Sequence, residues 1–122
     1  MQDFRKLRVW QRAHAFELAI DKFVRRLSKS SPAGRKAQLI ESSESVPANI
    51  AEGCGAASQR EFARFLDNAI KSSTETENHL IAIRDKQQAP REECDSLIDE
   101  ISQIRRMTYS LRKKVRANLG EG

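Results

Sequence analysis

Apolar residues recur at alternating spacings of three and four along four separate stretches of this chain, and no other feature limits the fold as strongly. Such spacing places the apolar side chains on one face of a helix. We therefore expect four helices, over about residues 4–28, 32–53, 58–86 and 90–117. Amphipathic helices joined by short loops favour an antiparallel up-down-up-down bundle. The sequence predicts an all-α four-helix bundle that forms one domain over residues 1–122.

Residues that start helices stand near the expected boundaries. Asp3 is a candidate N-cap for the first helix. Pro32 and Pro90 suit the first turns of the second and fourth helices, where the missing N–H of proline has no helical partner to lose. Ser58 and Glu61 have the spacing of a capping box, which predicts a strong start for the third helix.

Pro47 lies inside the second predicted helix, and this helix closes on Gly53. An internal proline removes one backbone hydrogen bond and presses on the carbonyl four residues earlier, at a cost of about 3 kcal/mol in an ordinary helix. We therefore expect a second helix kinked at Pro47. Gly53 has the position of a C-cap glycine.

Asn49 and Glu52 flank this proline and glycine, and they support two interpretations. In the first, they present a polar functional site where the kinked helix ends. In the second, which we favour, both are structural: the Asn49 amide satisfies the carbonyl freed by the proline, and Glu52 pairs with Arg60 or Arg64. No nucleophile or metal-ligand set surrounds them in the sequence, so the structural interpretation needs fewer assumptions.

Charge is distributed unevenly along the 122 residues. The formal net charge of +5 combines +7 over residues 1–36, −7 over residues 37–100 and +5 over residues 101–122. Both ends of the chain are therefore basic and the middle is acidic. No apolar run approaches the roughly 20 residues that span a bilayer, and no signal peptide is recognisable. We expect a cytoplasmic protein without a membrane partner, with Cys54 and Cys94 as reduced thiols.

The basic ends predict a surface for nucleic acid. In the expected bundle the last helix runs antiparallel to the first, so its C-terminal end lies beside the start of the chain. A concentration of cations there would attract phosphate backbones. The alternative is that cations at a helix C-terminus complement the macrodipole and keep the surface soluble. The candidate nucleic-acid-binding residues are Arg5, Lys6, Arg8, Arg12, Arg105, Arg106, Arg112, Lys113, Lys114 and Arg116.

Aromatic residues add little to this prediction. Exposed rings stack on unpaired bases, and Trp10 and Tyr109 are the two candidates. Trp10 neighbours the first apolar stripe and is expected to pack in the core or an interface, whereas Tyr109 lies on a mixed face. We therefore expect recognition of the backbone rather than of bases.

The sequence predicts neither a metal site nor an enzyme. Glu75 and His79 are four residues apart and share a helix face, but a metal centre in a bundle draws such ligands from several helices. No catalytic triad, glycine-rich phosphate loop or paired catalytic carboxylates are recognisable. We expect no cofactor and no catalytic residue.

Three segments give the chain a resemblance to a known family: Phe4–Gln11, Ser45–Gly53 and Arg60–Leu66. Together they resemble the four-helix-bundle proteins encoded in intervening sequences of bacterial 23S rRNA genes. That resemblance implies the same bundle and a homopentamer around a central opening, but no established biochemical function. The residues that match the family motif, and that we expect to be structural, are Pro47, Asn49, Glu52, Gly53, Ser58 and Glu61.

The third helix departs from the family pattern at its centre. Lys71 replaces a glycine, and Ser73 and Thr76 replace apolar residues. Together with the serines of the antiparallel second helix, these residues predict a seam rich in hydroxyl groups between the second and third helices. A seam made wholly of aliphatic side chains would contradict this prediction.

Two functions follow from these observations. The first is a non-enzymatic oligomer that binds the RNA or DNA backbone through a basic rim, repeated in each copy. The second is a protein-interaction scaffold, as in the similar accessory protein of diversity-generating retroelements. The sequence predicts oligomerisation because large exposed apolar patches usually mark interfaces, and several apolar residues lie off the main stripes: Leu7, Val9, Trp10, Phe65 and Ile70.

Overall fold

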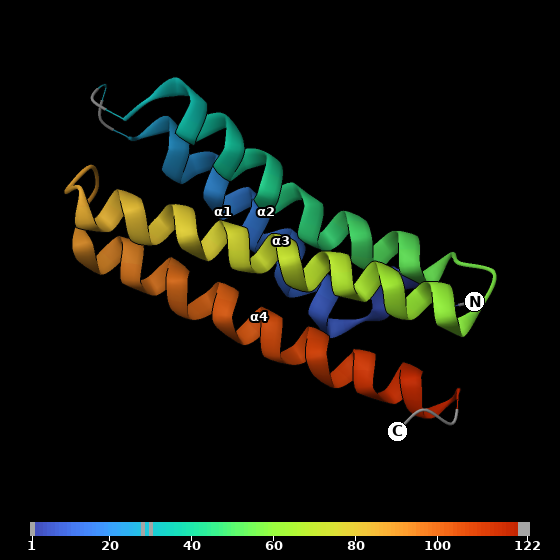
Figure 1. The fold of residues 1–122 in the computed structure, drawn as a ribbon. Coiled ribbons are helices and arrows are strands. Elements are labelled where there is room, and N and C mark those ends of the chain that lie inside the picture. Colours follow the sequence, from blue (N-terminus) through green and yellow to red (C-terminus); the bar gives the residue numbers. More distant parts are fainter. Residues whose placement is uncertain (1, 28, 30, 120–122) are drawn as a thin grey trace.

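The chain forms four long helices and one short 3-10 turn (Figure 1). The computed structural model describes residues 2–27, 29 and 31–119. The elements in chain order are η1 (Phe4–Lys6), α1 (Arg8–Arg25), α2 (Ala33–Cys54), α3 (Gln59–Asp85) and α4 (Arg91–Ala117). Each helix packs against the next, and α1 also contacts α4, which closes the bundle. The predicted all-α four-helix bundle is confirmed.

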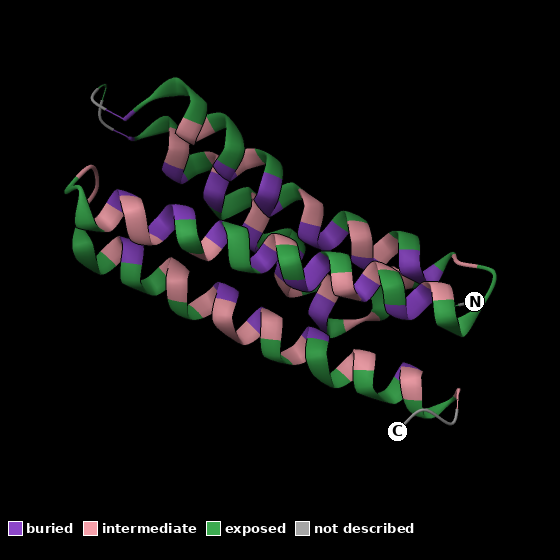
Figure 2. Cartoon of the chain, in the orientation of Figure 1, coloured by how far each residue is buried: buried purple, intermediate pink, exposed green. Residues whose placement is uncertain are grey.

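The buried side chains line the inner faces of all four helices (Figure 2). Aliphatic residues fill the centre, and Ile20, Leu39, Leu66, Leu80 and Ile104 are each 0% exposed. These residues occupy the spacings of three and four that the sequence shows, so the predicted stripes are the core. No helix in the described part of the chain has the length and hydropathy that crossing a membrane requires.

The first helix starts later and ends earlier than predicted. The Asp3 side chain accepts a hydrogen bond from the Arg5 backbone N–H at 3.1 Å, and so caps η1 rather than α1. Leu7 then adopts an extended conformation (φ −77°, ψ 125°), which separates η1 from α1. Helix α1 stops at Arg25, three residues before the approximate end that the sequence predicts. Ser28 and Ser30, part of the expected loop, lie outside the described residues.

Two proline assignments shift by one position. Pro32 and Pro90 are the N-caps of α2 and α4 rather than residues of their first turns. Their backbone is extended, with ψ of 140° and 133°, so the helical hydrogen bonds begin one residue later. This difference of one residue leaves the topology unchanged.

The assignment of Gly53 as a C-cap is wrong. Helix α2 continues to Cys54, and its C-cap is Gly55, which has right-handed backbone angles (φ −89°, ψ 0°). A Cβ atom on Gly53 would lie 2.7 Å from Cδ1 of Phe62 and 3.2 Å from Cβ of Phe65. Gly53 is therefore required because α2 and α3 approach closely there, and not because the helix ends.

Helix α3 ends in a C-terminal cap that the sequence does not predict. Gln87 is in the left-handed region (φ 58°) and its N–H donates to the Arg84 carbonyl, while the Gln88 N–H donates to the Ile83 carbonyl. These two bonds form a Schellman motif, in which glycine usually occupies the left-handed position. Helix α3 consequently stops at Asp85, one residue before the predicted end.

Candidate nucleic-acid interface

The start of α1 and the end of α4 lie at the same end of the bundle (Figure 1). Arg12 of α1 reaches Met107 of α4, with 3.5 Å between Nη1 and Sδ. Gln2 and Lys114 line the same pocket of about 340 Å³. The predicted juxtaposition of the two basic ends is therefore present in the structure.

Four of the ten candidate cations form ion pairs with other residues in the described part of the chain. Arg5 lies 3.0 Å from Asp3, and Arg12 lies 2.5 Å from Glu100. Arg105 pairs with Glu77 at 2.5 Å, and Arg112 pairs with Asp67. The hydrogen bond that Arg12 donates to the Glu100 carboxylate raises the pKa of Arg12. These four arginines are held by carboxylates, so they have less charge to offer a polyanion.

These carboxylate partners could not be identified from the sequence. Asp67, Glu77 and Glu100 lie 45, 28 and 88 residues from the arginines that they contact. Knowing that they meet requires the register of α4 against α3 and α1, which the apolar spacing alone does not determine. The negative charge of residues 37–100 was the available signal. In a bundle of four helices, the acidic residues of α3 must lie next to the basic residues of α4.

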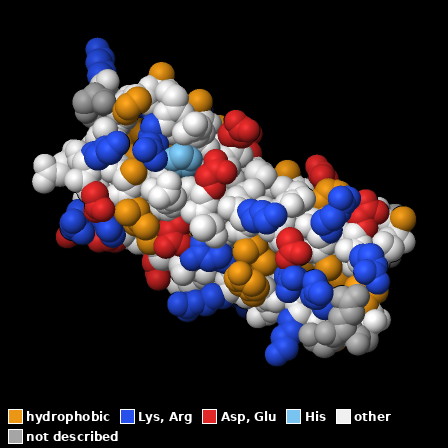
Figure 3. Space-filling model, in the orientation of Figure 1, with side chains coloured by type: hydrophobic (Ala, Val, Ile, Leu, Met, Phe, Trp, Pro, Cys, Tyr) orange, Lys and Arg blue, Asp and Glu red, His pale blue; other side chains and the backbone are white. Residues whose placement is uncertain are grey.

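Five of the other candidates are exposed and form no ion pair with another described residue: Lys6, Arg8, Arg106, Lys113 and Lys114. We call these five residues the basic surface. Arg8 lies one turn before Arg12 on α1, and Arg12 faces α4, so Arg8 shares that side of the helix. Lys and Arg side chains gather at the lower right of Figure 3, where α4 ends. The tenth candidate, Arg116, is half-buried.

The outward side of α4 changes sign along its length. Glu92, Asp95 and Asp99 are exposed in its first half, and Arg106 and Lys113 are exposed in its second half. Glu92 lies in the first turn, where the positive end of the helix favours a carboxylate, and Lys114 lies in the last turn, where the negative end favours a cation. The net positive charge on the exposed side of α4 therefore lies in its second half.

The two candidate aromatic residues differ in their surroundings. Trp10 stacks on His14 with 4.9 Å between ring centroids, and meets Phe4 edge-on at 5.0 Å. Its predicted packing role is confirmed. Tyr109 is 52% exposed and lines a depression of about 360 Å³ on α4, together with Ser110, Arg112, Lys113 and Arg116.

The residues that match the family motif have structural contacts. Asn49 Nδ2 donates to the Ser45 carbonyl at 2.8 Å and to Ser45 Oγ at 2.9 Å, so its partner is not the carbonyl freed by Pro47. Pro47 is buried, and α2 continues on both sides of it. Ser58 Oγ accepts from the Glu61 backbone N–H at 3.1 Å, as predicted for a capping residue.

Glu52 is exposed on the last turn of α2. Of the two arginines expected to pair with it, Arg64 has its guanidinium 3.8 Å from the Glu61 carboxylate, one turn away on its own helix. Glu61 therefore serves α3 in two ways, as a first-turn carboxylate near the positive helix end and as a partner for Arg64.

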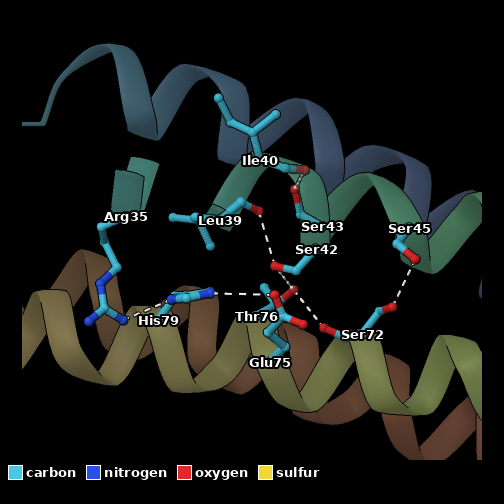
Figure 4. A network of polar contacts seen from close by, with 10 residues as sticks. All are labelled: Arg35, Leu39, Ile40, Ser42, Ser43, Ser45, Ser72, Glu75, Thr76 and His79. Atoms are coloured by element: carbon cyan, nitrogen blue, oxygen red, sulfur yellow. Dashed lines mark hydrogen bonds and ion pairs between the residues drawn. The ribbon is translucent and has the colours of Figure 1, made fainter. Parts of the chain in front are cut away.

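The seam between α2 and α3 carries the predicted hydroxyl groups (Figure 4). Thr76 Oγ1 donates to Ser42 Oγ, and Ser72 Oγ donates to Ser45 Oγ, both at 2.8 Å. Ser73 Oγ donates to the Ile70 carbonyl of its own helix at 2.6 Å. The predicted hydroxyl seam is confirmed. The buried hydroxyl groups of this seam have hydrogen-bond partners within the protein, as buried polar groups require.

His79 lies at one end of this seam and is buried. Its Nδ1 is 2.8 Å from Arg35 Nη1, and its Nε2 is 3.6 Å from the Glu75 carboxylate (Figure 4). Because Arg35 can only donate, Nδ1 must accept, and a metal ion would compete with this bond. No group of three or more His, Cys, Asp or Glu side chains suited to a metal ion occurs among residues 2–27, 29 and 31–119.

Both cysteines are buried free thiols. Burial raises the pKa of Cys54 and of Cys94 above the usual value for a thiol. A raised pKa leaves less thiolate at neutral pH, so neither side chain has the character of a nucleophile.

The comparisons with known proteins agree with this geometry. A family model described as 23S rRNA-intervening sequence protein matches residues 5–110. The chain belongs to this family. The family region therefore includes all of η1, α1, α2 and α3 except Phe4, and most of α4.

One solved structure has a fold similar to that of this 23S rRNA-intervening sequence protein. A protein of unknown function from the S23 ribosomal protein family of Bacteroides thetaiotaomicron has a crystal structure that is 25% identical, with a TM-score of 0.81. The similarity covers 86% of this chain and 98% of that protein. No curated protein matches the chain.

Proposed function

We propose that this member of the family binds the phosphate backbone of RNA or DNA through its basic surface and acts without catalysis. The observation that carries the proposal is a set of five exposed cations that have no carboxylate partner among the described residues. Phosphates are strongly attracted to such groups because binding releases the counterions condensed on the nucleic acid.

The helix macrodipole explains only part of this surface. Lys114 lies in the last turn of α4, where a cation is stabilising. Arg8 is the first residue of α1, where a cation is unfavourable, and Arg106 lies three turns before the end of α4. Since stability does not favour a cation at Arg8, its presence supports a role toward an external anion.

The proposal includes assembly into a homo-oligomer, a pentamer by family resemblance, that repeats the basic surface in each copy. Repeated weak contacts with one polyanion raise the overall affinity without any new contact. The apolar residues expected to form exposed patches do not support this step, because Val9 and Ile70 are buried and Leu7, Trp10 and Phe65 are half-buried. Among the described residues, the exposed large apolar side chains are instead Leu18 and Tyr109.

The test compares two triple variants with the same change of charge. The first, Arg106→Gln/Lys113→Gln/Lys114→Gln, removes three cations of the basic surface. The second removes one arginine and two lysines from the opposite end of the bundle, where all three are exposed: Lys22→Gln, Arg25→Gln and Lys86→Gln. Both variants lower the formal net charge from +5 to +2, so any difference between them reports position rather than total charge.

Affinity for labelled RNA and DNA would be measured between 50 and 200 mM salt. If all three removed cations contact phosphates, the slope of log affinity against log salt should fall by roughly 2 for single strands in the first variant. The control variant should keep nearly the slope of the natural sequence. If the salt slope fell equally in both variants, binding would depend on total charge, and the assignment to the basic surface would be wrong. No binding at low salt would overturn it and leave the scaffold function, with a protein partner.

A further inference from the structure

Tyr109 occupies a position that backbone binding alone does not require. It is 52% exposed, although a tyrosine ring in water forgoes the hydrophobic stabilisation that burial supplies. Figure 3 shows apolar surface over α4 bordered by Lys and Arg side chains. Leu18, the other exposed large apolar residue of the described chain, is 49% exposed on α1 and serves as a comparison.

Cations surround the Tyr109 ring on its own helix. Arg105 and Arg106 precede it by four and three residues, and Arg112, Lys113 and Arg116 follow it by three, four and seven. Residues at these spacings lie on the same face of a helix. Two carboxylates hold members of this set, Glu77 on Arg105 and Asp67 on Arg112, so the neighbourhood keeps an excess of positive charge.

Leu18 has fewer cations beside it. Its neighbours at the same helical spacings are His14, Ala15, Asp21, Lys22 and Arg25. This set contains two cations and one aspartate, and Leu18 itself has no aromatic ring. Among the described residues, an exposed ring that lines one depression together with several cations is found at Tyr109.

We propose that Tyr109 is a stacking platform for an unpaired base, so that this surface prefers single-stranded nucleic acid to duplex. The inference rests on the proposed function, because the cations beside the ring must first hold the phosphates. An aromatic ring next to a positively charged groove is the arrangement by which proteins bind single strands without reading sequence. Bases within a duplex stack on one another and present no free face to the ring.

This inference replaces the expectation from the sequence that only the backbone is recognised. The exposure of Tyr109 could not be predicted from its sequence neighbours. Met107 and Leu111 are half-buried and Thr108 is buried, so the residues around Tyr109 do not form a uniformly exposed segment. The ring itself points to the depression on the outer face of α4, with Ser110 beside it.

The experiment measures the affinity of Tyr109→Ala, Tyr109→Phe and the control Leu18→Ala. The probes are a single-stranded RNA, a single-stranded DNA of the same sequence, that DNA with abasic sites, and the corresponding DNA duplex, all at one salt concentration. Tyr109→Ala should weaken binding to the base-containing single strands about 5- to 10-fold, the lower part of the range for one stacked base. Affinity for the abasic strand and the duplex should change less than twofold.

The other variants separate stacking from other causes. Tyr109→Phe keeps the ring and should bind within twofold of the natural sequence, and Leu18→Ala should do the same. If Tyr109→Ala loses affinity for both single-stranded RNA and single-stranded DNA, the ligand is any unpaired strand. If it loses affinity for the RNA alone, the ligand is unpaired RNA. An equal loss on the duplex or the abasic strand, or no loss on any probe, would overturn the inference.

The two proposals fail in different ways. If Tyr109→Ala has no effect while Arg106→Gln/Lys113→Gln/Lys114→Gln still lowers the salt dependence, backbone binding stands and base stacking is wrong. If no probe binds even at low salt, both proposals are wrong. Circular dichroism of each variant verifies that the helices persist, which is expected because both substituted side chains are exposed.

Discussion

Helix α3 makes two long contacts, and the bundle holds them by different means. Against α2 two cross-helix bonds join short neutral side chains, Thr76 to Ser42 and Ser72 to Ser45, and Arg35 bonds to His79 at one end of the seam. Against α4 the polar contacts are ion pairs of long side chains at the edge of the contact: Arg84–Asp95, Arg105–Glu77 and Arg112–Asp67. In both, later residues of one helix meet earlier residues of the other, as antiparallel packing requires.

The difference shows two ways to set the register of antiparallel helices. Short hydroxyl side chains and a glycine allow the backbones to approach, so the α2–α3 contact depends on the size of each residue. The arginines pair with carboxylates at the edge of the α3–α4 contact, where water partly screens them, so the polar part of this contact depends on charge. Substitutions that change volume should therefore act mainly on the first contact, and salt should act mainly on the second.

The largest effect should come from adding one methyl group to the α2–α3 contact. In Gly53→Ala the new Cβ would lie 2.7 Å from a ring carbon of Phe62, which is 6% exposed and has little room to move. We expect an overpacking cost of about 3 kcal/mol, offset by about 1 kcal/mol because alanine favours a helix more than glycine does. Urea unfolding should show a net loss of about 2 kcal/mol.

Gly34 provides the matched control within the same helix. A Cβ at Gly34 meets no atom within 4 Å, so Gly34→Ala should stabilise the protein by up to about 1 kcal/mol. The two substitutions are chemically identical and should have opposite signs. Equal effects would show that Gly53 is not required by close helix approach.

A smaller effect should come from removing one hydroxyl group from the seam. Thr76 is 0% exposed, and Thr76→Val deletes its bond to Ser42 and its bond to the Ser72 carbonyl of its own helix, while nearly conserving shape. We expect a loss of about 1 kcal/mol in the free energy of unfolding, the usual net value of one hydrogen bond. A double-mutant cycle with Ser42→Ala should assign at least half of this loss to the pair.

Thr74→Val is the control for this cycle. Thr74 is exposed on the same helix, and its hydroxyl bonds to the Ile70 carbonyl of its own helix. The same chemical change there should have an effect within about 0.5 kcal/mol of zero, as for surface substitutions generally. A loss as large as that of Thr76→Val would mean that valine disfavours α3 wherever it is placed, and that the seam is not special.

The two contacts also differ in how far the sequence predicts them. The hydroxyl seam was predictable because Ser73 and Thr76 occupy apolar positions of the α3 stripe, opposite serines of α2. Gly53 was assigned a wrong role, because a glycine near a helix end has the same pattern whether it caps the helix or admits a neighbour. Its true role depends on Phe62, which only packing brings against it.

The sequence predicted where on the bundle the candidate interface lies, but not which residues belong to it. The net charges of the chain ends and the antiparallel topology bring the basic residues together, as the contact of Arg12 with Met107 shows. Which cations remain exposed depends on carboxylates far away in sequence, such as Asp67 and Glu100. The exposure of Tyr109 likewise depends on the rotation of α4 about its axis.

The smallest effect should come from the α3–α4 ion pairs, and its salt dependence separates the two contacts most clearly. Arg105 and Glu77 have side chains 20% and 24% exposed, so water screens the pair only in part. A double-mutant cycle with Arg105→Met and Glu77→Gln should give a coupling of about 0.5 kcal/mol at 0.1 M salt, within the range for such pairs.

Raising the salt to 1 M shortens the screening length from about 10 Å to about 3 Å, and this coupling should fall by at least half. The Thr76–Ser42 coupling joins neutral groups in the interior and should stay unchanged over the same range. Arg64 and Glu61, whose side chains are 72% and 42% exposed, give a control cycle expected to be weaker at every salt concentration. A coupling for Arg105 and Glu77 that ignores salt would show that hydrogen-bond geometry, rather than charge, holds α4 against α3, and the contrast between the two contacts of α3 would disappear.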